Sequence, residues 1–168
     1  MVASHQTHTT NIRRVTTADR GKGIVRPRDY ENIDGLITDE PGLVLVTYFA
    51  DCVPLYFVDP VHRAIGLAHS GWRGTAGRMG ECMLRAMHEA FGTEPEEVCA
   101  VIGPCICQDC YEVSADVAEQ FENYSEAVRA GKEPGKYQLD LRAVNRRILL
   151  DAGVAEERLE SPRICTCC

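Results

Sequence analysis

Two short apolar runs joined by a turn sequence constrain the fold of this chain most strongly. The runs are PLYFVD, from Pro54 to Asp59, and RAIGLAHS, from Arg63 to Ser70. Residues 59–62 between them read DPVH, and this combination of aspartate and proline favours a tight turn. The pattern therefore predicts a β-hairpin in which residues 54–59 and 63–70 are neighbouring strands.

The same patterns predict further elements along the chain. Residues 13–32 are polar and predict a short strand followed by a mobile loop. Apolar residues at helical spacing predict a helix that begins near Thr75, with this residue as its N-cap. Other strands are expected over 42–49, 97–104 and 137–141, and other helices over 114–124 and 142–153. Together they predict an α/β fold, a single domain over residues 1–168 with a mixed β-sheet flanked by helices.

Composition limits the partners and the cellular compartment. The chain has 168 residues and a formal net charge of −7, which argues against a broad nucleic-acid or anionic-membrane surface. No apolar run has the length of a signal peptide core or a membrane span, so we expect a cytoplasmic protein. The nine cysteines are an odd number, which favours reduced thiols or metal ligands over a disulfide scaffold.

One thiol and one imidazole are expected at the same end of the predicted hairpin. Cys52 lies just before the first strand and His69 lies at the end of the second, so adjacent strands would bring them together. Such a pair suits either a nucleophile with its base or two metal ligands. The alternative is that both are structural residues, a thiol packed as an apolar group and a hydrogen-bonded histidine.

The sequence GWRG after His69 predicts an anion site. Gly71 and Gly74 permit a sharp turn into the helix expected near Thr75, where unpaired amides and the helix dipole favour phosphate or carboxylate. Arg73 adds a planar, permanently charged donor, and we assign the site to Arg73, Gly74 and Thr75. Alternatively, Arg73 pairs with a structural acid.

The remaining candidate ligands are cysteines in two short segments. These are CICQDC, from Cys105 to Cys110, and CTCC, from Cys165 to Cys168. Thiolates at such spacing suit a second, structural zinc site. Incidental reduced cysteines are the favoured interpretation, because Cys-x-Cys and Cys-Cys pairs hold a metal less well than Cys-x-x-Cys.

Four motifs in order, QTHTT, ADCVP, HSGWRG and IGPCICQDCYEV, resemble the multi-copper polyphenol oxidoreductase (laccase domain) family. Its members are also described as purine nucleoside phosphorylases with adenosine deaminase activity and as peptidoglycan editing factors. The resemblance implies a fold related to cysteine hydrolases of the deamidating-toxin type. It also implies a catalytic metal site, with Zn²⁺ or Cu²⁺, formed by His8, Cys52 and His69.

The resemblance leaves several functions open. The leading one is a metal-dependent purine nucleoside phosphorylase that also deaminates adenosine, with adenosine, inosine and methylthioadenosine as substrates. The alternatives are a cysteine-dependent amide hydrolase editing peptidoglycan precursors, a polyphenol oxidase, and a non-enzymatic metal-binding domain. Five histidines are too few for a multi-copper cluster, which argues against the oxidase. Family members usually extend further at both ends, so we expect a chain truncated at both termini.

Overall fold

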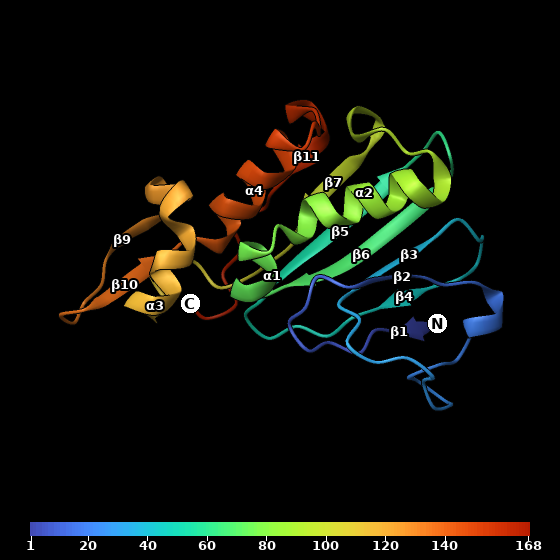
Figure 1. Ribbon diagram of the computed structural model, residues 1–168, viewed down its shortest axis with the longest axis horizontal. Coiled ribbons are helices and arrows are strands. Elements are labelled where there is room, and N and C mark those ends of the chain that lie inside the picture. Colours follow the sequence, from blue (N-terminus) through green and yellow to red (C-terminus); the bar gives the residue numbers. More distant parts are fainter.

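A six-stranded mixed β-sheet forms the centre of the molecule, and three helices cover one of its faces (Figure 1). The computed structural model describes all residues, 1–168. Across the sheet the strand order is β11-β7-β5-β6-β3-β2. The strand bounds are β2 Ile12–Arg14, β3 Gly35–Thr38, β5 Val53–Asp59, β6 Ala64–Ser70, β7 Cys99–Ile102 and β11 Leu159–Glu160. The predicted α/β class with a mixed sheet is confirmed.

The hairpin expected from the two apolar runs is present as β5 and β6. These strands are antiparallel, with Val53 opposite Ser70 and Pro54 opposite His69. The turn between them is stabilised by the Asp59 carboxylate, which accepts hydrogen bonds from the amides of Val61 and His62 at 2.8 and 2.9 Å. The residues before β5 therefore lie beside the end of β6, as the sequence predicts.

One face of the sheet packs against α1, α2 and α4 (Figure 1). Their bounds are α1 Trp72–Ala76, α2 Met79–Phe91 and α4 Leu141–Asp151. Met83 of α2 is fully buried, and a Cβ on Gly66 of β6 would lie only 2.7 Å from its terminal methyl group. Glycine in β6 thus permits the close approach of helix and sheet. Each methionine buried in this way stabilises the fold by about 2 kcal/mol.

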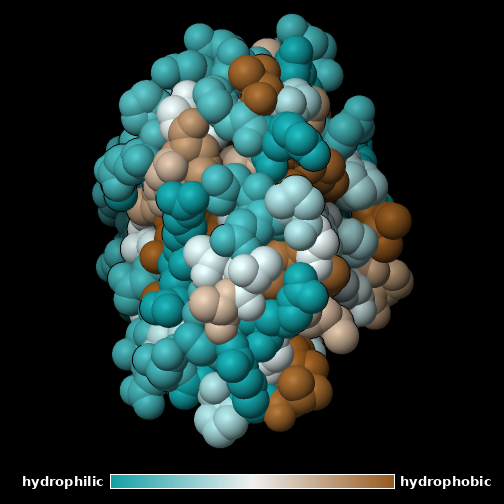
Figure 2. Space-filling view, turned by 90° about the vertical axis from the view of Figure 1, so that its right-hand side faces the viewer, coloured by the Kyte–Doolittle hydropathy of each residue, from teal (hydrophilic) through white to brown (hydrophobic).

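Side chains on the opposite face of the sheet are more exposed to solvent. Tyr56 and Val58 of β5 are 41% and 46% exposed, and they alternate with buried neighbours. The molecular face shown in Figure 2 is mostly hydrophilic, and its hydrophobic groups are small and separate. None of the helices has the length and apolar character needed to cross a bilayer.

A smaller three-stranded sheet with the order β8-β10-β9 lies at one end of the molecule (Figure 1). Its elements are β8 Glu112–Ser114, α3 Ala115–Ala118, the 3-10 segment η3 Glu119–Ala127, β9 Val128–Ala130 and β10 Lys136–Leu139. The N-terminal region adds a two-stranded pair, β1 Val2–Ala3 with β4 Leu45–Val46. The remaining short helical turns are η1 Thr17–Asp19, η2 Pro95–Glu97 and η4 Glu156–Arg158.

Three of the sequence predictions are wrong in extent. The strand expected over 42–49 shrinks to β4, because this segment pairs only with two-residue β1 and exposes Val44 and Tyr48. The helix expected from Thr75 is broken at Arg78, which has a left-handed φ of 58° and separates α1 from α2. The helix expected over 114–124 is regular only in α3, since Phe121 and Tyr124 leave helical geometry.

Candidate functional site

Three of the predicted site residues, His8, Cys52 and His69, are brought together at the end of the β5–β6 hairpin. Their ligand atoms all lie within 4.8 Å of one another, and we call this group the histidine cluster. His69 comes from β6 and is 5% exposed, whereas Cys52 lies in the loop before β5. His8 comes from the N-terminal segment, and its ring centroid is 4.9 Å from that of His69.

Asp34 holds two members of the histidine cluster in place, and sequence analysis missed it. Its carboxylate is buried and accepts hydrogen bonds from the amides of Thr7, His8 and Thr9 at 2.8 to 3.1 Å. The same carboxylate accepts a bond from the Thr9 hydroxyl at 2.9 Å. Its Oδ1 atom lies 2.9 Å from Nδ1 of His69. One side chain therefore fixes the loop that carries His8 and the ring of His69.

This arrangement determines which nitrogen of His69 is available. A carboxylate only accepts hydrogen bonds, so Nδ1 of His69 carries a proton, and Nε2 is the atom that can bind a cation once its own proton is lost. Burial is the largest influence on the pKa of His69 and lowers it, but the interactions with Asp34 and Cys52 outweigh burial and raise this pKa to about 9. Burial likewise opposes ionisation of Asp34, yet its hydrogen bonds lower its pKa to about 2.

Glycine after β6 lets the histidine cluster pack closely. A Cβ on Gly71 would lie 2.9 Å from Cδ2 of His8 and 3.0 Å from Sγ of Cys52, so these side chains would have to shift. Phe49 covers another side, with its ring centroid 5.7 Å from that of His69. The first glycine of GWRG therefore leaves room for the two neighbouring ligands.

The donor set of the histidine cluster fits a divalent transition metal. One thiolate and two imidazoles form a ligand set that zinc accepts at catalytic sites, with a fourth position left for water or substrate. Metal-binding histidines usually donate their other ring N–H to a carboxylate, and His69 does so to Asp34. The residues present are therefore suited to hold the metal that the resemblance implies.

The predicted anion site needs correction. Thr75 is not the N-cap of a helix but lies inside α1, where Gly71 is the N-cap. The Thr75 hydroxyl is buried and bonded to Ser70 and Asn145, at 3.0 and 2.9 Å, and its amide donates to the carbonyl of Gly71. Gly74 is buried as well. Of Arg73, Gly74 and Thr75, only Arg73 is exposed and offers a charged group to solvent.

Arg73 and Tyr111 lie near the histidine cluster. The Arg73 guanidinium stacks over the ring of Trp72, with its central carbon 4.2 Å from the ring centroid. Burial raises the pKa of Tyr111, the charge of Cys52 raises it further and Arg73 lowers it, so these three groups interact electrostatically. Tyr111 was missed from the sequence, although it belongs to the CYEV part of a family motif.

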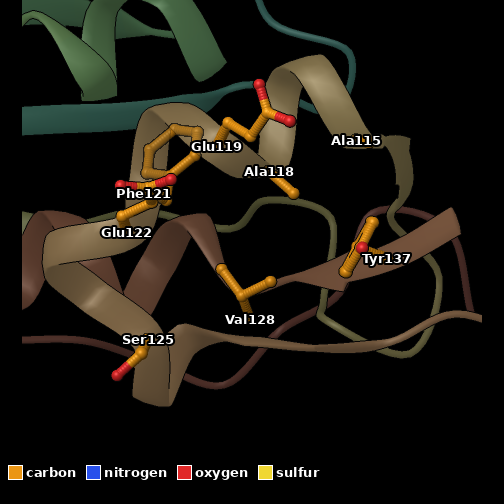
Figure 3. Close-up of a pocket in the computed structure, with 8 residues that line it drawn as sticks. All are labelled: Ala115, Ala118, Glu119, Phe121, Glu122, Ser125, Val128 and Tyr137. Atoms are coloured by element: carbon orange, nitrogen blue, oxygen red, sulfur yellow. The ribbon is translucent and has the colours of Figure 1, made fainter. Parts of the chain in front are cut away.

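The surface hollows of the molecule lie elsewhere. The hollow in Figure 3 has a volume of about 280 Å³ and lies between η3 and the small sheet, where Glu119, Phe121 and Tyr137 line it. None of the four hollows is lined by His8, Cys52 or His69. The candidate chemistry therefore lies at the end of the central strands β5 and β6, where His8 is exposed, and not in the apolar pocket.

The fold agrees with what comparison with known proteins finds. The profile of the multi-copper polyphenol oxidoreductase laccase family matches residues 1–168, and the chain belongs to this family.

Individual relatives carry more specific names. The chain is 40% identical to purine nucleoside phosphorylase YlmD of Bacillus subtilis, over 98% of this chain and 61% of that protein. It is 34% identical to adenosine deaminase RL5 of an unknown prokaryote, over 100% of this chain and 66% of that protein. The crystal structure of hypothetical protein YfiH from Bacillus licheniformis superposes with a TM-score of 0.92 at 38% identity, covering 98% of this chain and 64% of that one. The chain thus spans less than two thirds of the length of these relatives.

Proposed function

We propose that the histidine cluster is the active site of a metal-dependent purine nucleoside phosphorylase that also deaminates adenosine. The observation that carries the proposal is the convergence of His8, Cys52 and His69 within 4.8 Å, with Asp34 bonded to the far side of His69. The substrate class is supported by the names of the relatives, one a purine nucleoside phosphorylase and another an adenosine deaminase.

His8, Cys52 and His69 would hold the metal, for which zinc is the first choice and copper the second. A cation bound there would act as a Lewis acid that promotes deprotonation of water near neutral pH. Asp34 keeps the Nδ1 proton of His69 in place, which leaves Nε2 as the ligand atom. Because Asp34 also accepts a hydrogen bond from the amide of His8, the ring of His69 and the backbone of His8 are both held before substrate arrives.

Arg73 is assigned to phosphate. Its guanidinium is exposed, is stacked on Trp72 and interacts electrostatically with Tyr111, which Cys52 also influences. A planar guanidinium binds a phosphate through two parallel hydrogen bonds, so it would hold phosphate for attack on C1′ of the ribose. Arg73→Lys should raise the KM for phosphate several-fold, because a point charge lacks this geometry. The matched control is Arg85→Lys, an exposed arginine on α2, which should leave this KM unchanged.

The test incubates zinc-loaded protein with adenosine, with and without phosphate, and follows inosine, adenine and ribose 1-phosphate by chromatography. Phosphate-dependent release of adenine and phosphate-independent formation of inosine are both expected. Cys52→Ala should abolish both, whereas Cys99→Ser, which alters an exposed thiol outside the histidine cluster, should keep them. Equal turnover of adenosine by Cys52→Ala and by the wild-type chain would contradict the proposal.

A second function is favoured by the order Cys52, His69, Asp34. A thiol, an imidazole and a carboxylate in this order match a nucleophile, its base and an orienting group. The chain would then be an amide hydrolase that acts on peptidoglycan precursors. Release of amino acids from a muropeptide by chelator-treated protein, without turnover of adenosine, would support this function over the first.

A further inference from the structure

A second group of possible metal ligands lies between the loop after β7 and the C-terminal segment. The Sγ atoms of Cys107, Cys110, Cys165 and Cys168 all lie within 4.8 Å of one another, and we call this group the cysteine cluster. The sulfurs of Cys107 and Cys168 are 4.0 Å apart. None of these residues belongs to the histidine cluster.

The spacing of these four cysteines fits tetrahedral coordination. They form two Cys-x-x-Cys pairs, Cys107 with Cys110 and Cys165 with Cys168. The sequence analysis considered only the closer Cys-x-Cys and Cys-Cys spacings and therefore favoured incidental thiols. In a tetrahedral zinc site with Zn–S distances of about 2.3 Å, neighbouring sulfurs lie about 3.8 Å apart. The observed separations require only small side-chain rotations to reach this value.

The backbone around the cysteine cluster is already ordered. Cys105 and Cys165 form a parallel β-bridge, and the amide of Cys105 donates to the carbonyl of Ile164 at 3.3 Å. The amides of Cys107 and Cys167 both donate to Sγ of Cys165 at 3.3 Å. Hydrogen bonds from amides to sulfur support thiolate ligands in metal sites.

A hollow with more arginines than carboxylates lies beside the cysteine cluster. Cys107 lines this hollow of about 470 Å³ together with Arg129, Arg142, Arg146 and Arg163, and the carboxylates of Asp109 and Asp140 line it as well. Four thiolates with one Zn²⁺ carry a net charge of −2, which the excess of guanidinium groups would partly offset. This setting makes an all-thiolate site compatible with its surroundings.

We propose that the cysteine cluster binds one zinc ion as a structural site and fixes the C-terminal segment to the loop after β7. The same two segments contact the loop that carries Cys52. The Thr166 hydroxyl donates to the Asp51 carboxylate at 2.9 Å, and the Ile106 amide donates to the Asp51 carbonyl at 3.0 Å. The zinc site would therefore also support the position of the residue before Cys52.

The first experiment isolates the cysteine cluster without altering it. The Cys52→Ala chain, purified under reducing conditions, is loaded with zinc, freed of excess metal, and measured by elemental analysis and X-ray absorption at the zinc edge. About one zinc per chain with four sulfur neighbours at about 2.3 Å is expected. Zinc bound mainly by nitrogen or oxygen, or no retained zinc, would overturn the proposal.

The second experiment adds Cys110→Ser and Cys168→Ser to the Cys52→Ala chain, with Cys99→Ser added instead as the matched control. The zinc content should fall to about zero in the chain with Cys110→Ser and Cys168→Ser, and remain near one per chain in the Cys99→Ser control. Circular dichroism checks that both chains are folded. Equal zinc in both chains would overturn the assignment, as would a Cys107–Cys168 disulfide found by mass spectrometry in metal-free protein prepared with reductant. Because Cys52 is absent throughout, the result is independent of the proposed nucleoside chemistry.

Discussion

The histidine cluster and the cysteine cluster are both groups of candidate metal ligands, but different parts of the fold hold them. The histidine cluster is built on the β5–β6 hairpin of the central sheet, and the buried Asp34 carboxylate fixes its ligands. The cysteine cluster lies between two irregular segments joined by a single β-bridge, and Cys168 is exposed.

This difference separates two ways of making a site. In the histidine cluster the protein orients its ligands through hydrogen bonds, so the metal is expected to add chemistry to a formed structure. In the cysteine cluster the ligands come from two irregular segments that a bridge and a few hydrogen bonds already join, so a metal is expected to add folding free energy by linking these segments. Changes at Asp34 should therefore disturb the fold and the histidine cluster together and leave the cysteine cluster intact.

The largest effect is expected from Asp34→Ala. The substitution leaves the amides of Thr7, His8 and Thr9 without their acceptor and removes the partner of His69. We expect the free energy of unfolding to fall by about 3–5 kcal/mol, measured by urea denaturation. The control is Asp39→Ala, which removes a partly exposed ion pair with Arg14 and should cost less than about 1 kcal/mol. If Asp34→Ala and Asp39→Ala lowered the free energy of unfolding by similar amounts, the stabilising role assigned to Asp34 would be contradicted.

A smaller effect is expected from Gly71→Ala. The added methyl group would meet His8 and Cys52 at 2.9 and 3.0 Å, so the two ligands must move apart. We expect a loss of about 1–3 kcal/mol in stability and weaker zinc binding at the histidine cluster, while zinc at the cysteine cluster is unchanged. Gly74→Ala is the control, because its methyl group would have ordinary contacts of 3.5 Å or more. Unchanged zinc affinity when Gly71→Ala is added to the Cys110→Ser, Cys168→Ser chain would argue that the histidine cluster is not the ligand set.

The third effect is expected from pH, which changes charges and keeps the packing. Asp34 has a lowered pKa of about 2, so its stabilisation is present above its unfolded pKa near 3.8 and is lost as the pH falls towards 2. His69 has a raised pKa of about 9, so its stabilisation is present below 6.5 and is lost as the pH rises towards 9. Chelator-treated protein should therefore lose stability in urea titrations between pH 6.5 and 9. His69→Gln should flatten this slope, and an unchanged slope would contradict the assignment.

The sequence was sufficient to predict the β5–β6 hairpin and the approach of Cys52 to His69. Two short apolar runs and a turn with aspartate and proline are local signals, and the structure pairs these runs as neighbouring antiparallel strands. Strand β3 and Asp34 were missed because GLIT has only four residues, is fully buried and shows no alternation. The position of β3 between β6 and β2 depends on tertiary contacts, which a local sequence pattern does not predict.

The cysteine cluster had a local signal that the sequence analysis did not use. Cys107 with Cys110 and Cys165 with Cys168 have the spacing of a metal clamp, but 54 residues separate Cys110 from the next cysteine, Cys165. Only the pairing of β11 with β7 brings the two segments side by side. Their convergence therefore became visible in the structure and not in the spacing.

The central claim is that Asp34 prepares the histidine cluster for a metal, and zinc affinity measures this directly. The Cys110→Ser, Cys168→Ser chain removes the cysteine cluster, so a competition titration with a chromogenic chelator reports on the histidine cluster. We expect about one zinc per chain, bound about 10–100-fold more weakly when Asp34→Asn is added, since the amide cannot replace the carboxylate as acceptor for both His69 and the amides. Equal affinity with aspartate and asparagine, or no zinc binding in either chain, would contradict the account.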